Sequence, residues 1–93
     1  MPETLVDNVA GHRFELATPA GMAFIAYRRS GNVLQLLHAE VPPALGGRGL
    51  GTRLVRETLD LIRSRGERIV PVCPFIVSFV ARHAEYASLV QAR

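Results

Sequence analysis

The first half of the chain alternates apolar and polar residues with the period of two that is typical of half-buried β-strands. The alternation is weak over residues 4–8, clear over residues 13–16, and rich in apolar side chains over residues 22–29 and 33–41. Turn-forming residues separate these segments, at Gly11-His12, between Thr18 and Gly21, and between Ser30 and Asn32. The pattern therefore predicts an antiparallel meander of about four strands, with residues 4–8 at its edge.

The last of these strands also predicts how its side chains divide between the two faces of the sheet. Successive side chains of a strand point to opposite faces. One face is expected to carry Val33, Gln35, Leu37, Ala39 and Val41. The other is expected to carry Leu34, Leu36, His38 and Glu40. His38 and Glu40 should therefore lie side by side near the end of the strand.

From residue 51 onward the apolar positions recur with the spacing of an amphipathic helix. The expected inward positions are Gly51, Leu54, Val55, Thr58, Leu59 and Ile62. Gly66 follows, where a helix commonly ends in glycine. A short apolar strand over residues 68–72 should then run parallel to the strand ending at Val41, through a right-handed crossover. Pro71 lacks a backbone donor, which predicts that this strand is at the edge of the sheet or is distorted at Pro71.

The rest of the chain is expected to be helical. Residues 75–82 follow Pro74, and proline is favoured in the first turn of a helix. Residues 85–90 form a final short helix. The fold class that follows is mixed α/β, with one domain spanning residues 1–93.

Composition narrows the class of protein. Hydrophobic residues make up 48% of the 93 residues and charged residues 20%, which is typical of a globular chain rather than a disordered one. No apolar run reaches the roughly 20 residues that cross a bilayer, and the N-terminus lacks the basic and apolar regions of a secretory leader. We therefore expect a cytoplasmic protein with no membrane contact. The single cysteine, Cys73, cannot form an internal disulfide.

A glycine-rich segment, Gly46-Gly47-Arg48-Gly49-Leu50-Gly51, joins the last meander strand to the long helix. Glycines let the backbone approach a ligand closely, and a helix start offers unpaired N–H groups, so this segment predicts a phosphate site. A P-loop is excluded because the chain contains no lysine. A dinucleotide fingerprint fits poorly, because Thr52 occupies the position of its third glycine.

The segment resembles the pyrophosphate-binding motif of the GNAT superfamily of N-acetyltransferases, [Q/R]-x-x-G-x-[G/A]. Gly49 and Gly51 match its last two fixed positions, whereas Gly46 stands where the superfamily usually has Gln or Arg. Wider agreement is with the small, single-domain YjdJ-type acetyltransferase-like family. The resembling stretches are residues 13–16, 27–28, 38–42, 46–51, 73–75 and 83–86. Two departures are Ala39, where that family commonly has Thr, and Ala84, where it commonly has Pro.

This resemblance implies a minimal GNAT-like fold that binds acetyl-CoA where the strand ending at Val41 diverges from the strand ending near Val72. The backbone around Glu40 and Val41 would bind the pantetheine arm, as an added strand would. The backbone N–H groups of the glycine segment would bind the pyrophosphate. The residues expected at the donor site are Val41, Gly46, Gly47, Arg48, Gly49, Leu50, Gly51 and Thr52, with the Arg48 guanidinium either on the phosphate or in solvent.

Acetyl transfer to an amine requires a deprotonated amine, a polarised thioester carbonyl and a proton for the leaving thiolate. Glu40 is the candidate base, directly or through water, or else an ordinary solvated carboxylate. His38 is a second candidate, or a packed, hydrogen-bonded histidine. Cys73 is expected near the thioester, as pocket lining or as a transient acyl acceptor, or else as a small buried hydrophobe. Tyr86 is the candidate acid for the thiolate, or else a core aromatic.

Three functions remain open at this level. The first is an acetyl-CoA-dependent N-acetyltransferase whose acceptor amine belongs to a small molecule or a protein. The second is a non-catalytic module that binds or senses CoA. The third is a nucleic-acid-associated domain, suggested by the net charge of +3 but opposed by scattered arginines with few aromatics between them. The three histidines and one cysteine lack metal-ligand spacing, so no metal is expected.

Overall fold

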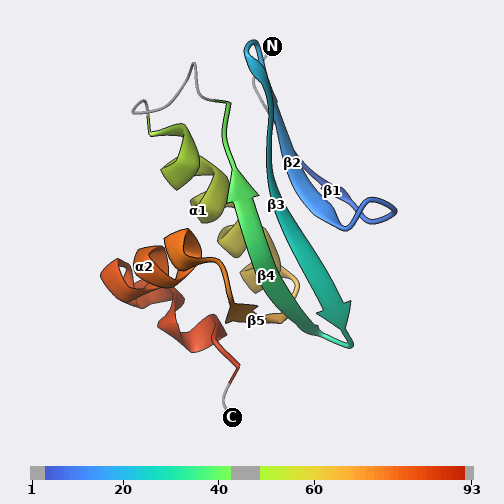
Figure 1. The fold of residues 1–93 in the computed structure, drawn as a ribbon. Coiled ribbons are helices and arrows are strands. Elements are labelled where there is room, and N and C mark those ends of the chain that lie inside the picture. Colours follow the sequence, from blue (N-terminus) through green and yellow to red (C-terminus); the bar gives the residue numbers. More distant parts are fainter. Residues whose placement is uncertain (1–3, 43–48, 92–93) are drawn as a thin grey trace.

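The computed structural model describes residues 4–42 and 49–91, which form a five-stranded sheet with two α-helices and a short 3₁₀ helix, η2 (Figure 1). The strands are β1 (Leu5–Asn8), β2 (Arg13–Thr18), β3 (Gly21–Ser30), β4 (Val33–Glu40) and β5 (Arg68–Pro71). The helices are α1 (Leu50–Ser64), α2 (Pro74–Arg82) and η2 (Ala84–Leu89). Each element predicted from the pattern of the sequence is present, with small differences at its ends.

The strands stand in the sheet in the same order as in the chain. β1 to β4 pair antiparallel, and β5 pairs parallel with β4 after the connection through α1. This arrangement confirms the predicted meander, crossover helix and parallel fifth strand. β5 is at the edge of the sheet, as Pro71 predicted.

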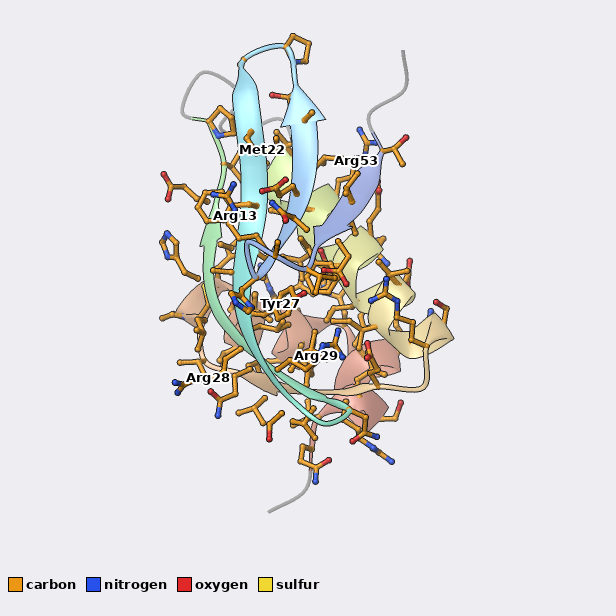
Figure 2. The ribbon with its side chains drawn as sticks, turned by 90° about the vertical axis from the view of Figure 1, so that its right-hand side faces the viewer. Arg13, Met22, Tyr27, Arg28, Arg29 and Arg53 are labelled. Carbon is orange, nitrogen blue, oxygen red and sulfur yellow. The ribbon has the colours of Figure 1, made fainter. Side chains whose placement is uncertain are left out.

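Both α-helices pack on one side of the sheet, and Figure 2 views the strands from the opposite side with the helices behind them. α1 contributes fully buried side chains to the core at the positions that the helical spacing predicted, namely Leu54, Val55, Thr58, Leu59 and Ile62. The sheet side of the core comes from alternate residues of β2, β3 and β4. Those residues are Phe14, Leu16, Ala23, Ile25, Tyr27, Leu34 and Leu36. Because only one face of the sheet is covered, the other face remains open to solvent within the described chain.

A β-bulge in β4 changes which of its side chains reach that open face. Ala26 pairs with His38, whereas the next residue, Tyr27, pairs with Leu36, so Leu37 is an extra residue in β4. An extra residue shifts the alternation of side chains by one position. The prediction that His38 and Glu40 share a face with Leu34 and Leu36 is therefore wrong.

Beyond the bulge, Ala39 and Val41 pack against the core cluster, on the helix side. His38 and Glu40 stand opposite Ala26 and Phe24 of β3, and their side chains are 60% and 62% exposed. The bulge therefore moves these two polar side chains to the open face of the sheet while the chain continues as a strand.

β4 and β5 stop pairing just before this bulge. Their parallel register ends at Leu36 and Pro71, and the backbone N–H groups of Val72 and Cys73 both donate to the carbonyl oxygen of Leu36 at 3.0 Å. The chain then turns into α2, so the two strands separate at their carboxyl ends.

Candidate functional site

The site that the sequence predicts lies where β4 and β5 end and where α1 and α2 begin. A Cβ atom at Gly51, in the first turn of α1, would lie 3.2 Å from Cζ of Phe75 in the first turn of α2. The same point is 3.7 Å from Cγ2 of Val41, just after β4. The end of the strand and the starts of the two helices therefore lie close together around Gly51.

Gly49 forms the N-cap of α1 in a left-handed conformation, with φ of 74°. Residues with a Cβ atom rarely adopt this conformation, so glycine has a local structural reason here. The carbonyl oxygen of Gly49 accepts the first helical hydrogen bond, from the N–H of Arg53 at 2.9 Å. Within the described residues, no side chain caps this helix start and no acidic residue lies in its first turn.

The N–H groups at Leu50, Gly51 and Thr52 are therefore the first-turn groups that the helix itself leaves unpaired. Together with the helix dipole they favour an anion. Three further predicted donor-site residues, Gly46, Gly47 and Arg48, lie outside the described residues.

Part of the β4 edge is open beside this helix start. On the side of β4 that faces away from β3, no strand pairs with residues 37–40 in the part of the chain that the structure describes. A strand edge of this kind offers backbone groups to an extended ligand. Val41, which the sequence analysis assigned to the donor site, follows this edge directly and contacts the Gly51 position.

His38 and Glu40 form a polar pair on the open face of the sheet. Nε2 of His38 lies 3.1 Å from Oε2 of Glu40. The His38 ring also meets the ring of Phe24 edge-on, with 6.1 Å between ring centroids. The structure therefore brings the two candidate bases together, at the strand end that leads into the predicted donor site.

Cys73 lies at the point where the two strands separate. It is the N-cap residue of α2, its side chain is 6% exposed, and its backbone N–H donates to the carbonyl oxygen of Leu36 at 3.0 Å. Its thiol is thus a buried group beside the last paired residue of β4.

Tyr86 occupies a different environment from the other predicted catalytic residues. It is 1% exposed, and its hydroxyl donates to Oδ1 of Asp60 on α1 at 2.7 Å. Burial, and next the hydrogen bond to Asp60, raise the pKa of the Tyr86 hydroxyl. The guanidinium of Arg63 lies 5.1 Å from the centroid of its ring. Its contacts are those of a core aromatic that joins η2 to α1, and its role as the acid stays a prediction.

Phe75 is a residue of this site to which the sequence analysis gave no role. Its ring is 42% exposed, although the tip of the ring packs on Gly51. The signal in the sequence is the Cys-Pro-Phe segment, which places an aromatic in the first turn of a helix directly after a strand. The partner of that ring could not be read from the local pattern, because Gly51 lies far away in the chain.

The described residues contain neither a metal-binding cluster nor a membrane-spanning helix. No group of three or more His, Cys, Asp or Glu side chains is arranged to hold a metal ion in the described ranges. Likewise, none of the described helices has the length and apolar character needed to span a bilayer.

Comparison with known proteins agrees with this arrangement. The family model described as GCN5-related N-acetyl-transferase matches residues 13–89, which is most of the chain. A solution NMR structure of a GCN5-like protein from Staphylococcus aureus, for which N-acetyltransferase activity is proposed, superposes with a TM-score of 0.72. The alignment covers 97% of this chain and 89% of the other at 20% sequence identity. At this identity, the match shows that the two chains share a fold.

Proposed function

The chain belongs to the GCN5-related N-acetyltransferase family, and on that premise we propose that it binds acetyl-CoA and transfers the acetyl group to an amine. The observation that carries the proposal is the bulge at Leu37. Pairing between β4 and β5 ends there, so a strand edge without a partner strand among the described residues lies beside the start of α1, where no described side chain caps the helix. One end of the sheet thus offers backbone groups for an extended arm and a helix start for an anion.

The described residues fit such a donor. The first-turn N–H groups of α1 would bind the pyrophosphate, because no side chain or acidic residue of the described chain competes for them. The open edge at residues 37–40 would hydrogen-bond the pantetheine arm. The thioester would then lie at the separation of the strands, close to Leu36 and Cys73. When bound, acetyl-CoA supplies an acyl group activated by its thiol leaving group.

The acceptor amine would approach from the open face, because His38 and Glu40 lie there. Glu40 accepts the proton that the amine must lose, and His38 positions the carboxylate through the 3.1 Å contact. The amine nitrogen forms a bond to the carbonyl carbon, the carbon–sulfur bond breaks, and the thiolate takes up a proton. We do not assign that proton to Tyr86, because its hydroxyl already donates to Asp60 on α1.

A binding experiment tests the donor. Thermal shift and isothermal titration calorimetry with acetyl-CoA and CoA should both show binding, and a ligand at 100 times Kd adds about 2.7 kcal/mol of stability. A pool of short RNA and DNA serves as the comparison ligand. Stabilisation by nucleic acid but by neither form of CoA would reject the proposal.

A second experiment separates an enzyme from a binding module. Release of free thiol from acetyl-CoA is followed with a panel of small amines and of peptides that carry a free N-terminus or a lysine. Acceptor-dependent thiol release that matches acetylated product by mass supports the transferase. Tight binding with no release above buffer across the panel would instead support a protein that binds CoA without transferring the acetyl group.

A further inference from the structure

Phe75 is an exposed aromatic that packs beside Gly51 of α1 at the predicted donor site. Its Cζ and Cε2 atoms would lie 3.2 Å and 3.5 Å from a Cβ at Gly51. Cγ2 of Val41, just after β4, would lie 3.7 Å from the same Cβ. The ring therefore extends from the first turn of α2 to the first turn of α1, beside the end of the strand.

This contact gives Gly51 a role beyond approach to phosphate. A Cβ contact of 3.2 Å is tighter than most in packed proteins, so an alanine at position 51 would require the ring to shift by a few tenths of an ångström. Gly51 does not adopt the left-handed conformation that favours glycine at position 49. The described glycines with a positive φ do not include Gly51. Close packing against Phe75 is thus the local reason for glycine at this position.

Two other exposed apolar side chains belong to the segments that border the open strand edge. Leu37, the extra residue of the bulge, is 41% exposed, and Val72, just after β5, is 51% exposed. Leaving apolar surface in water is unfavourable, and large exposed apolar groups often mark sites of contact. The pantetheine arm of CoA is an extended chain with a branched apolar segment, which matches such a surface.

We propose that Phe75 is a positioning residue whose ring forms the apolar wall for the pantetheine arm, and that Gly51 is required to seat this ring. The inference rests on the proposed function. It separates two contributions to donor binding: backbone N–H groups at the start of α1 bind phosphate, and the ring on α2 packs against the arm. Replacing the ring should therefore affect ligands that contain the arm and leave ligands without it unchanged.

The test measures Kd by isothermal titration calorimetry for CoA and for adenosine 3′,5′-bisphosphate, which lacks the arm. Phe75→Ala should weaken CoA binding about 10-fold, which is the loss expected when a partly buried aromatic contact is removed. The Kd of the bisphosphate should stay unchanged. Phe75→Leu should weaken CoA binding by less than Phe75→Ala does. Val77→Ala is the matched control, because Val77 is on the same helix and is 46% exposed, and its Kd for both ligands should equal that of the wild type.

The role of Gly51 is tested by a rescue. Gly51→Ala should weaken CoA binding through displacement of the ring, and the double variant Gly51→Ala/Phe75→Leu, with a shorter side chain, should recover part of the loss. Equal CoA affinity in Phe75→Ala and wild type, or equal losses for both ligands, would overturn the inference and leave the proposed function standing. A wild-type protein that binds neither ligand would overturn both.

Discussion

The two ends of the β4–β5 pair are built in opposite ways. At the end where these strands begin, polar groups are paired: Asp7 accepts the Tyr27 hydroxyl at 2.7 Å and the Arg65 guanidinium at 2.8 Å. Arg29 and Glu67 form an ion pair close by, in which Oε2 of Glu67 is bonded whereas its buried Oε1 has no hydrogen-bond partner among the described residues. The N–H of Arg68 donates to the carbonyl oxygen of Asn32 at 2.8 Å. We call this the closed end.

At the open end, where β4 and β5 stop, the same two strands leave backbone groups without a strand partner within the described residues. Apolar side chains are exposed there, and α1 begins without a side-chain cap from the described residues. Buried polar groups that are satisfied stabilise a fold, whereas unsatisfied backbone and exposed apolar surface lower stability and favour ligands. The difference assigns stability to the closed end and binding to the open end.

The largest expected effect is on turnover. Glu40→Gln should lower kcat about 100-fold, within the range of about 10²–10⁴ for a lost general base, and leave the Kd of acetyl-CoA unchanged. Unfolding free energy should change by less than about 0.5 kcal/mol, because the His38–Glu40 pair is exposed. Thiol release and urea unfolding measure the two quantities. A variant with wild-type kcat would show that the base lies elsewhere.

The next effect is on stability and belongs to the closed end. Asp7→Ala should lower the unfolding free energy by about 2 kcal/mol, because the buried Tyr27 hydroxyl loses its acceptor and Arg65 loses its ion pair. Glu85→Ala is the control, since its contact with Arg56 is 3.5 Å long and exposed, and should cost less than about 0.5 kcal/mol. Kd for CoA should stay unchanged in Asp7→Ala. Weakened CoA binding in that variant would contradict the separation of the two ends.

A pair of glycines compares the ends directly. Gly49, at the open end, and Gly66, at the closed end, have φ of 74° and 70°, and a Cβ at either would meet no described atom within 4 Å. Either residue changed to alanine should cost about 1 kcal/mol of stability through backbone strain alone. Only Gly49→Ala should weaken CoA binding, by a few-fold, because it disturbs the start of α1. Equal CoA affinity in both variants would remove Gly49 from the donor site.

The smallest effect is a dependence on alkaline pH. Burial raises the pKa of Tyr27 and of Tyr86 above the usual range of a tyrosine hydroxyl, with hydrogen bonds to Asp7 and Asp60 next in importance. A raised folded-state pKa stabilises the fold below about pH 10, and this contribution is lost as the pH rises through the folded-state value. These are the two tyrosines of a chain without lysine, so few other groups titrate there.

Urea unfolding between about pH 8 and pH 11 measures this effect. The wild type should lose stability over the upper part of the range, and Tyr27→Phe/Tyr86→Phe should lose less. The single variant Tyr86→Phe also tests the role of Tyr86 in transfer. If Tyr86 is a core aromatic, kcat should stay unchanged; if it is the acid, kcat should fall. The same alkaline slope in wild type and double variant would contradict the raised pKa values.

Local pattern in the sequence was sufficient for most of the fold. Alternation defined the four meander strands, helical spacing defined the buried face of α1, and Pro74 marked the start of α2. These features depend on residues that are close in the chain, where periodicity is informative. The bulge was missed because the two consecutive leucines, Leu36 and Leu37, fit an apolar strand in either register.

The site was less predictable because its contacts join segments far apart in the chain. The packing of Phe75 on Gly51 and the hydrogen bond from Tyr86 to Asp60 both depend on how α2 and η2 pack against α1. No spacing rule connects such pairs. The glycine segment and the His38–Glu40 pair were noticed because each is a local motif. The face of the sheet on which that pair lies depends on the bulge, which the sequence did not predict.

The edge of the sheet at β5 has a consequence for solubility. Ile69 bridges to Val90, the N–H of Gln91 donates to the carbonyl oxygen of Ile69 at 2.8 Å, and Arg68 donates to the carbonyl oxygen of Ser88 at 2.7 Å. An uncovered strand edge can recruit a strand from a second molecule, which is a common route to aggregation. Here the last turns of the chain occupy that edge, so a four-residue strand at the margin of the sheet is shielded from edge-to-edge association.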